Sequence, residues 1–404
     1  MNSLLVNSNL KYSKLSVNGS KSESNRLLIL KSLYKNLSII NISDCDDTIF
    51  LNNALNKSSS IVDIGHAGTA MRFLTSFFSI QADSPKTLTG SSRMKQRPIK
   101  ILVDALRNLG AEIAYLEKDG FPPLLINPSV LIGGEINIDS SISSQYISSL
   151  LLIAPKINGG LKINLNGKET SLPYIKMTIN LLEQIGVTVI CNKNSIEVKE
   201  LKETIPKEIF VESDWSSASY FYSMVAMAPI GFKICLNSFK KDSIQGDSLV
   251  KDFFQIFGVQ TNFLNDSIII EKVAEAKKSI SLDLSSNPDL AQTICVTCLG
   301  LKVSCNLNGL HTLKIKETDR LNALKNELSK FGLDVKITSD SIKFNSDVDL
   351  IPNIEIETYD DHRMAMAFAC LSVKTNIKIL NSQVVSKSYP SFWSDLSKIG
   401  IVSK

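Results

Sequence analysis

Five segments of the 404-residue sequence repeat one pattern, in which an amphipathic stretch ends at a glycine and a β-branched stretch follows at once. The five glycines, 68 to 76 residues apart, are Gly110, Gly186, Gly258, Gly332 and Gly400. Each segment predicts a helix, a glycine C-cap and a strand. The period is too long for a solenoid and fits a unit of several strands and two helices, used about six times. We therefore expect an α/β fold with two lobes of three units each.

A second recurring feature is a turn rich in Gly, Ser, Asp or Asn that opens a helix. Examples are "NGSKSESNR", "DIGHAGTAMR", "KETDR" and "DDHRMAM". Such turns expose backbone N–H groups, and several carry Lys or Arg, which the positive end of the helix dipole disfavours. For a single turn, an ordinary cap beside a solvated charge is the simpler interpretation. Recurrence of the pattern favours binding of anions.

Arginine usage supports the same interpretation. Only seven of the 44 basic residues are Arg, and Arg107 is the one that stands outside these turns. The other six lie in or beside them: Arg26, Arg72, Arg93, Arg97, Arg320 and Arg363. A guanidinium grips carboxylate or phosphate with two parallel hydrogen bonds, which an ammonium cannot do. We expect a ligand that carries phosphate and carboxylate groups.

Residues 313–332 predict a short strand followed by a helix that ends at Gly332. Thr318 is the expected N-cap, and Glu327 falls on the face expected to be exposed. The expected buried face consists of Leu321, Leu324 and Leu328. Arg320 in the first turn needs a negative partner, and we expect the ligand to supply it.

Composition excludes several function classes. The net charge of +4 is small and comes without basic blocks, so neither a nucleic-acid nor a membrane surface is indicated. No apolar run approaches the roughly 20 residues that span a bilayer, and the polar N-terminus lacks a signal-peptide core. We expect a cytoplasmic protein.

The cysteines and histidines do not suggest a metal site. Seven scattered cysteines do not form a disulfide framework. Cys295 and Cys298 form a C-x-x-C without a second pair or a nearby His, so we interpret them as core residues. The three histidines, His66, His311 and His362, match no metal-binding motif.

Nine short motifs occur in an order that is similar to one protein family. They are "GSKSESNR", "AGTAMR", "SRMKQRP", "SSQY", "SDWSSASY", "NPDLAQT", "KETDR", "DDHRMAM" and "SKSYPSFW". Over essentially its whole length the chain resembles the 5-enolpyruvylshikimate-3-phosphate (EPSP) synthase family of enolpyruvyl transferases. The resemblance implies a two-lobed inside-out α/β barrel, each lobe built from three βαβαββ-type units.

The resemblance also implies how the lobes divide the site. Residues 20–211 would form one lobe, with much of the shikimate 3-phosphate site. Residues 1–19 and 212–404 would form the other lobe, and the active site would lie in the cleft between them. The second lobe would carry Asp289, Glu317, Arg320, Arg363 and Lys387.

The implied reaction transfers the enolpyruvyl group of phosphoenolpyruvate to the 5-hydroxyl of shikimate 3-phosphate, on the shikimate pathway to chorismate and aromatic amino acids. It is the reaction that glyphosate inhibits in this family. The resemblance implies no metal and no organic cofactor. We expect a monomer whose partners are these two small molecules, with no nucleic-acid or membrane partner.

The site residues implied by the resemblance fall into three groups. The expected catalytic residues are Asp289, Glu317 and Lys21, with Asp289 as general base and Glu317 as the partner for the methylene proton. The expected shikimate 3-phosphate ligands are Lys21, Ser22, Arg26, Ser143, Ser144, Gln145, Ser171, Tyr174, Asp289, Thr312 and Lys316. The expected phosphoenolpyruvate ligands are Lys21, Gly68, Arg93, Gln145, Arg320, Arg363 and Lys387, with Arg72 as a supporting cation.

Each assignment has a structural alternative. Asp289 could be a helix cap, Glu317 one half of a surface ion pair, and Gly68 a turn residue. His362 is expected to orient its neighbours. The chain departs from the family pattern at His66 and at Thr312, where Asn is usual in the family.

The nearest alternative activity is transfer of enolpyruvyl to UDP-N-acetylglucosamine. That branch usually carries a reactive Cys where this chain reads "SSRMKQRP", and a Lys-Asn-Ala stretch where it reads "SKSESNR". A non-catalytic anion-binding relative would lack Asp289 or Glu317. RNA-phosphate cyclases share related units but need a nucleotide-handling His. A P-loop is excluded because "NGSKS" lacks its glycine spacing.

Overall fold

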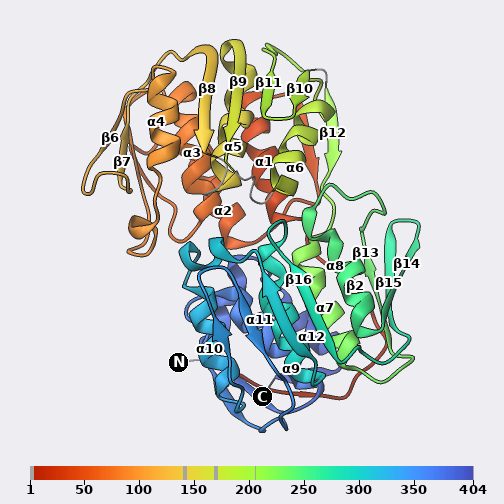
Figure 1. The fold of residues 1–404 in the computed structure, drawn as a ribbon. Coiled ribbons are helices and arrows are strands. Elements are labelled where there is room, and N and C mark those ends of the chain that lie inside the picture. Colours follow the sequence, from red (N-terminus) through yellow and green to blue (C-terminus); the bar gives the residue numbers. More distant parts are fainter. Residues whose placement is uncertain (1–3, 140–142, 168–171, 205, 404) are drawn as a thin grey trace. The chain divides into compact units, whose positions relative to one another are not determined.

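The computed structural model describes residues 4–139, 143–167, 172–204 and 206–403. The chain divides into two compact units. Unit 1 combines residues 1–18 with residues 212–404, and unit 2 is residues 19–211. Figure 1 shows the chain coloured along its sequence.

Unit 2 contains three sheets among its described residues. Its helices are α1 (Lys21–Leu33), α2 (Asp46–Asn56), α3 (Gly68–Gln81), α4 (Lys100–Asn108), α5 (Ser144–Ile153) and α6 (Leu172–Gln184), with 3-10 turns η1 (Met94–Gln96) and η2 (Ala154–Lys156). The first sheet has the strand order β4 (Ile61–Asp63), β5 (Lys86–Thr89), β7 (Leu124–Ile126), β6 (Ile113–Tyr115). The second has the order β10 (Val189–Asn192), β11 (Ser195–Val198), β9 (Asn158–Asn166), β8 (Ile132–Asp139). The third is the pair β12 (Lys207–Phe210) and β3 (Leu37–Ile40).

Unit 1 also contains three sheets in its described part. Its helices are α7 (Trp215–Met227), α8 (Val250–Phe253), α9 (Ala291–Gly300), α10 (Arg320–Ser329), α11 (His362–Ala369) and α12 (Phe392–Lys398), and its 3-10 turns are η3 (Gly246–Leu249), η4 (Phe254–Phe257), η5 (Pro288–Leu290), η6 (His311–Ile315), η7 (Cys370–Val373) and η8 (Ser382–Lys387). The first sheet has the strand order β20 (Ile354–Ile356), β21 (Ile377–Ile379), β1 (Leu4–Ser8), β22 (Ile401–Ser403). The second has the order β14 (Val259–Leu264), β15 (Ser267–Lys272), β13 (Lys233–Asn237), β2 (Lys14–Ser16). The third has the order β16 (Ser279–Asp283), β17 (Ser304–Asn308), β19 (Ile342–Phe344), β18 (Lys336–Ile337).

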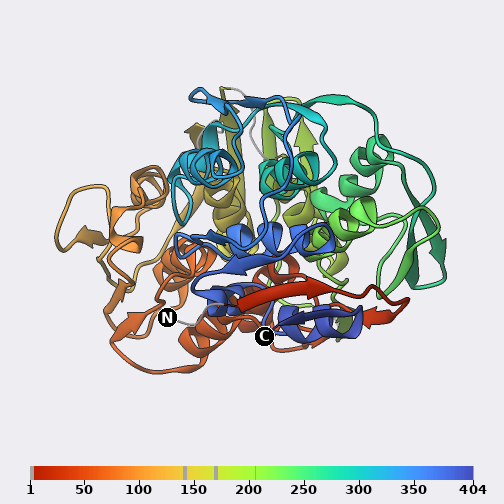
Figure 2. The same ribbon diagram turned by 90° about the horizontal axis from the view of Figure 1, so that it is seen from below.

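The four-stranded sheets share one strand order. In β4-β5-β7-β6, the first two strands are parallel and the other two pairings are antiparallel. The sheets built on β8 and β16 repeat this arrangement. Parallel neighbours need a helical crossover and antiparallel ones need only a short turn, so this order follows from a βαβαββ unit. The N-terminal strand β1 completes a sheet whose other strands come from the C-terminal part of the chain (Figure 2).

The helices lie at the centre of each unit and the sheets surround them. In unit 1, α7, α9 and α11 pack on one another, and every residue of α9 and α11 is buried. In unit 2, α1, α3 and α5 form the corresponding group. Strand β15 alternates between buried and half-buried residues, as expected when one face of a sheet packs on helices. This is the arrangement that the term inside-out describes.

The helix-glycine-strand pattern is confirmed. All five repeat glycines have a positive φ, between 75° and 101°. Each lies at the end of a helix and is followed by a strand: β6, β10, β14, β18 or β22. Cys295 and Cys298 are fully buried in the core of unit 1, which confirms their interpretation as packing residues.

The prediction for residues 313–332 was partly wrong. No strand precedes the helix here, because His311–Ile315 forms the 3-10 turn η6. Asp319, not Thr318, is the N-cap of α10 and accepts a hydrogen bond from the Asn322 N–H at 3.2 Å. The three leucines are buried as predicted. Glu327 is buried too, because it accepts hydrogen bonds from the Tyr359 hydroxyl and the Glu357 N–H.

Candidate active site

The start of α1 in unit 2 holds a buried arginine whose hydrogen-bond partners are neutral groups. Arg26 Nε donates to Thr178 Oγ1 at 2.7 Å and Nη2 donates to Ser148 Oγ at 3.1 Å. Nη1 donates to the carbonyl of Ser22, and Nη2 also to that of Tyr174. Burial lowers the pKa of Arg26 to about 10. Arg26 forms no ion pair within 4 Å among the described residues, and its guanidinium lies 5.4 Å from the centre of the Phe73 ring.

The other predicted residues of the α1 mouth lie close by. Lys21, the first residue of α1, forms a 3.2 Å ion pair with Asp47 at the start of α2. Ser22 is half-buried in the first turn of the same helix. Lys21 therefore already has one carboxylate partner, which the sequence did not reveal.

The start of α5 presents the predicted serines and glutamine. Ser143 is the N-cap and accepts a hydrogen bond from the Gln145 N–H at 3.3 Å, and Ser144 is buried behind it. Gln145 Nε2 donates to Thr69 Oγ1 on α3 at 3.2 Å. Tyr174, on α6, lies in the same unit, whereas Ser171 falls outside the described residues.

The start of α3 combines a buried glycine with two buried arginines. Arg72 donates to the carbonyls of Gly68 at 3.0 Å and Pro98 at 3.2 Å. The Arg97 guanidinium packs directly on Gly68, because a Cβ there would lie 2.5 Å from Arg97 Nη1. Arg93 is half-buried, and its Nη1 lies 3.5 Å from the Gln96 amide oxygen at an exposed position.

Arg97 thus packs on Gly68; it is among the arginines of the helix starts in the sequence but was not predicted as a site residue. The two arginines are four residues apart and flank the 3-10 turn η1, and Arg97 is buried whereas Arg93 is half-buried. Arg97 is 8% exposed and its Nε has no hydrogen-bond partner in the described part of the chain. A buried cation without a counter-charge is costly unless an anion joins it.

Unit 1 contains a different kind of cluster, centred on Arg320. Its guanidinium is 2% exposed and contacts three carboxylates. Nε donates to Asp361 Oδ2 at 2.7 Å, Nη1 to Asp289 Oδ1 at 2.9 Å and Nη2 to Glu317 Oε2 at 2.8 Å. The prediction that the ligand supplies the negative partner of Arg320 is therefore wrong for this structure, because the protein supplies three.

Further cations surround the same carboxylates. Arg363 Nη2 lies 3.0 Å from Asp289 Oδ2, and Lys316 Nζ lies 3.4 Å from Asp289 Oδ1. Lys387 Nζ lies 2.9 Å from Glu317 Oε1. Every cation that the sequence assigned to the site in residues 212–404 therefore lies in one network.

Three helix starts bring this network together. Asp289 lies in η5, which leads into α9, and Arg320 is the first residue of α10. Asp361 is the N-cap of α11 and accepts a hydrogen bond from the Arg363 N–H at 2.8 Å. Asp361 was not predicted, although an Asp directly before a helix start is the usual sequence sign of an N-cap.

The charges of the cluster fix the ionisation of Asp289. Burial opposes its ionisation, but the positive charges of Arg363, Lys316 and Arg320 outweigh burial and hold the pKa of Asp289 well below its usual range. Burial lowers the pKa of Lys316, against the attraction of Asp289. In this state Asp289 is a firmly ionised carboxylate and hence a weak base.

Thr312 and the two site histidines occupy distinct environments. Thr312, in η6, is 8% exposed, and its hydroxyl has no hydrogen-bond partner among the residues that the structure describes. His362 is buried beside Asp361, with 3.8 Å between Nδ1 and Oδ1. His66 is exposed just before α3.

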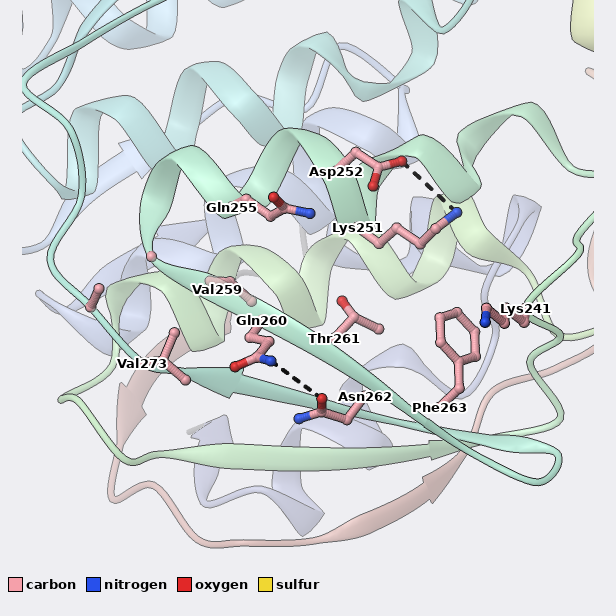
Figure 3. Close-up of a pocket in the computed structure, with 12 residues that line it drawn as sticks. Lys241, Lys251, Asp252, Gln255, Val259, Gln260, Thr261, Asn262, Phe263 and Val273 are labelled. Carbon is pink, nitrogen blue, oxygen red and sulfur yellow. Dashed lines mark hydrogen bonds and ion pairs between the residues drawn. The ribbon is translucent and has the colours of Figure 1, made fainter.

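A separate hollow of about 730 Å³ lies in unit 1 between α8–η4 and strand β14 (Figure 3). Lys251, Asp252 and Gln255 line one side, and Val259 to Phe263 line the other. None of the candidate site residues is among its lining residues.

No cluster of three or more His, Cys, Asp or Glu residues in the described ranges has the arrangement of a metal site. Within those ranges no helix has the length and apolar character needed to cross a bilayer.

Comparisons with known proteins agree with one another. Residues 50–396 match the family described as EPSP synthase (3-phosphoshikimate 1-carboxyvinyltransferase). The 3-phosphoshikimate 1-carboxyvinyltransferase of Bacteroides fragilis (strain YCH46) is 43% identical over 386 residues, covering 94% of this chain and 93% of the relative. One from Histophilus somni (strain 2336) is 36% identical over 419 residues and covers 96% of each chain.

Solved structures have the same fold. The EPSP synthase of Acinetobacter baumannii superposes with a TM-score of 0.79 at 21% identity, covering 100% of this chain and 99% of that chain. The enolpyruvyl transferase NikO of Streptomyces tendae gives 0.76 at 11% identity, covering 100% and 98%. The predicted enolpyruvyl transferase fold is confirmed, and the family match over most of the sequence shows that this chain belongs to the EPSP synthase family.

Proposed function

We propose that this chain transfers the enolpyruvyl group of phosphoenolpyruvate to the 5-hydroxyl of shikimate 3-phosphate and releases inorganic phosphate. The 5-oxygen forms a bond to the enol carbon and loses its proton, while the methylene carbon gains one. In the second half the methyl group gives a proton back, the bond to phosphate breaks and the double bond returns. Each half needs a proton donor and a proton acceptor.

One observation carries this proposal: both candidate proton-transfer carboxylates lie on a single guanidinium. Asp289 and Glu317 bind Arg320 Nη1 and Nη2 at 2.9 and 2.8 Å. Their positions are thereby fixed relative to each other, as general acid–base groups must be. We assign Asp289 to the 5-hydroxyl and Glu317 to the methylene carbon.

Binding of the anionic substrate would make these carboxylates more basic, because its anionic groups would displace them from their cations. The anionic groups of phosphoenolpyruvate compete for Arg363, Lys387 and Arg320, which hold Asp289 and Glu317 in the structure. A carboxylate that loses a cation becomes more basic, because less positive charge stabilises its ionised form. Substrate binding would therefore convert Asp289 from a counter-ion into a base.

Unit 2 would supply the remaining contacts. Arg26, Ser144 and Tyr174 would bind shikimate 3-phosphate, together with Ser22, Ser143, Gln145 and Ser171, and Thr312 and Lys316 would contribute from unit 1. Lys21, Gly68, Gln145 and Arg93 would bind phosphoenolpyruvate, and Arg97, which packs on Gly68, would add positive charge there. We also propose that the chain acts as a cytoplasmic monomer.

The test is release of inorganic phosphate by the purified protein. We expect release with phosphoenolpyruvate and shikimate 3-phosphate, and none when UDP-N-acetylglucosamine replaces the latter. Asp289→Asn and Glu317→Gln keep side-chain volume and remove a proton acceptor, so both should be strongly impaired while remaining folded. Release only with UDP-N-acetylglucosamine would overturn the proposal, as would full activity of both variants.

A further inference from the structure

His66 occupies the turn that leads into α3. It lies between β4 and α3, two residues before Gly68, and its side chain is exposed. Gly65, directly before it, has a φ of +53°, and its N–H donates to Asp63 Oδ1 at 2.8 Å. The tight turn therefore fixes the backbone position from which the His66 side chain projects.

The imidazole is tied to the segment that carries Arg97. His66 Nδ1 lies 3.0 Å from Ser91 Oγ, and the Ser91 N–H donates to the Gly65 carbonyl at 3.0 Å. Ser91 Oγ also accepts from the Met94 N–H at the start of η1. The other ring nitrogen, Nε2, has no partner among the described residues. One nitrogen thus fixes the ring and the other remains available.

The groups near this turn carry positive charge that no ion pair to Arg97 balances among the described residues. Arg97 packs on Gly68, and no ion pair to Arg97 occurs among the described residues. The N-terminus of the 14-residue helix α3 adds partial positive charge. The charged groups on the segments around the turn are Asp63 on the turn itself, Arg93, Lys95 and Arg97 on the 90–97 segment, Asp46 and Asp47 on α2, and Lys21, which pairs with Asp47.

We propose that His66 is a titratable specificity-determining residue for the anionic end of phosphoenolpyruvate. When the ring takes a proton from solvent, Nδ1–H donates to Ser91 Oγ, and the ring adds a positive charge to the turn two residues before Gly68. Histidine is the side chain that gains this charge near neutral pH. Binding of phosphoenolpyruvate therefore strengthens as the pH falls from 8 to 6. The inference rests on the proposed function of the site.

The kinetic test compares the wild type with His66→Asn. Asparagine can still bond Ser91 but cannot titrate. The ionisation of phosphoenolpyruvate itself is common to both proteins, so the informative quantity is the ratio of their KM values. We expect the KM of the variant to be near that of the wild type at pH 8 and about threefold to tenfold higher at pH 6, with similar kcat. His311→Asn, which removes another exposed histidine, should give a constant ratio.

A ratio that stays constant for His66→Asn between pH 6 and 8 would overturn the proposal. Proton NMR of the three histidines provides a test that does not depend on turnover. The signal lost in His66→Asn should titrate at a higher pH when inorganic phosphate is present than when it is absent. An unchanged or lowered midpoint would refute the anion contact. A protein that releases no phosphate in the activity assay fails the proposed function, while the NMR titration still decides the role of His66.

Discussion

Two buried arginines of unit 2, Arg26 and Arg97, are held in a different way from the buried Arg320 of unit 1. Arg26 and Arg97 in unit 2 are surrounded by hydroxyls, carbonyls and a helix start, with no carboxylate paired to them among the described residues. Arg320 in unit 1 contacts three carboxylates. We propose that an anionic substrate has two roles. In unit 2 it would supply a counter-charge that Arg26 and Arg97 lack among the described residues, and in unit 1 it would compete with the carboxylates already bound to Arg320.

The largest expected effect is on stability and separates the two kinds of site. Arg320→Met leaves Asp361 and two further carboxylates with less counter-charge, so we expect the free energy of unfolding to fall by about 3–5 kcal/mol. Arg26→Met removes a buried cation whose hydrogen-bond partners are neutral, so the loss should stay below about 2 kcal/mol. Denaturant unfolding of both variants measures the contrast, and equal losses would contradict it.

A conservative change at Arg320 should damage activity more than stability. Arg320→Lys keeps a positive charge but cannot bind Asp361, Asp289 and Glu317 together. We expect kcat/KM to fall roughly 100-fold or more because both candidate proton-transfer carboxylates lose their common hydrogen-bond donor. Arg107→Lys, on the surface helix α4, is the matched control and should stay within about twofold of the wild type. An unchanged rate in Arg320→Lys would remove Arg320 from the site.

The unit 2 site can be tested through its glycine. Gly68→Ala places a Cβ 2.5 Å from Arg97 Nη1 and 3.0 Å from Cζ, so the guanidinium must move. We expect the KM for phosphoenolpyruvate to rise by roughly tenfold, equivalent to about 1.4 kcal/mol. The midpoint of thermal unfolding should change little, because Gly68 does not need a left-handed backbone. A raised KM for shikimate 3-phosphate alone would place Arg97 at the other substrate.

The smallest expected effect is a change of stability with pH. The depressed pKa of Asp289 means that its ionised form stabilises the fold above about pH 4, the value for unfolded Asp, and that this contribution is lost as the pH falls through the folded-state pKa. Asp289→Asn lacks the contribution. The difference in unfolding free energy between wild type and variant should be constant from pH 8 to 5 and narrow below about pH 4. A difference that changes between pH 8 and 5 would contradict the assigned ionisation.

The repeat architecture followed from the sequence because glycine caps are local signals. A helix that ends at a left-handed residue needs glycine there, and all five expected positions have a positive φ. The helix starts that carry Lys or Arg were also predictable, because each is defined by a short contiguous motif. Arg320 and Arg363 were identified from their motifs alone, and both lie in one cluster.

The counter-ions were not predictable because they come from distant segments. Asp361 and Asp289 lie 41 and 31 residues from Arg320, and nothing in a single sequence shows which carboxylate a folded chain brings to which cation. Which of Arg93 and Arg97 packs on Gly68 depends on how η1 turns, which spacing alone does not fix. The prediction that Glu327 is exposed was wrong, because Tyr359 and Glu357, about 30 residues away, donate hydrogen bonds to its carboxylate in the interior.

The most direct test of the contrast between the units is a crystal structure with shikimate 3-phosphate and inorganic phosphate bound. We predict anion oxygens within hydrogen-bond distance of the Arg26 and Arg97 guanidinium groups, with Asp361 still bonded to Arg320 Nε. Bound anions that leave Arg26 and Arg97 untouched, or a protein carboxylate moved onto Arg97 in their place, would contradict the account.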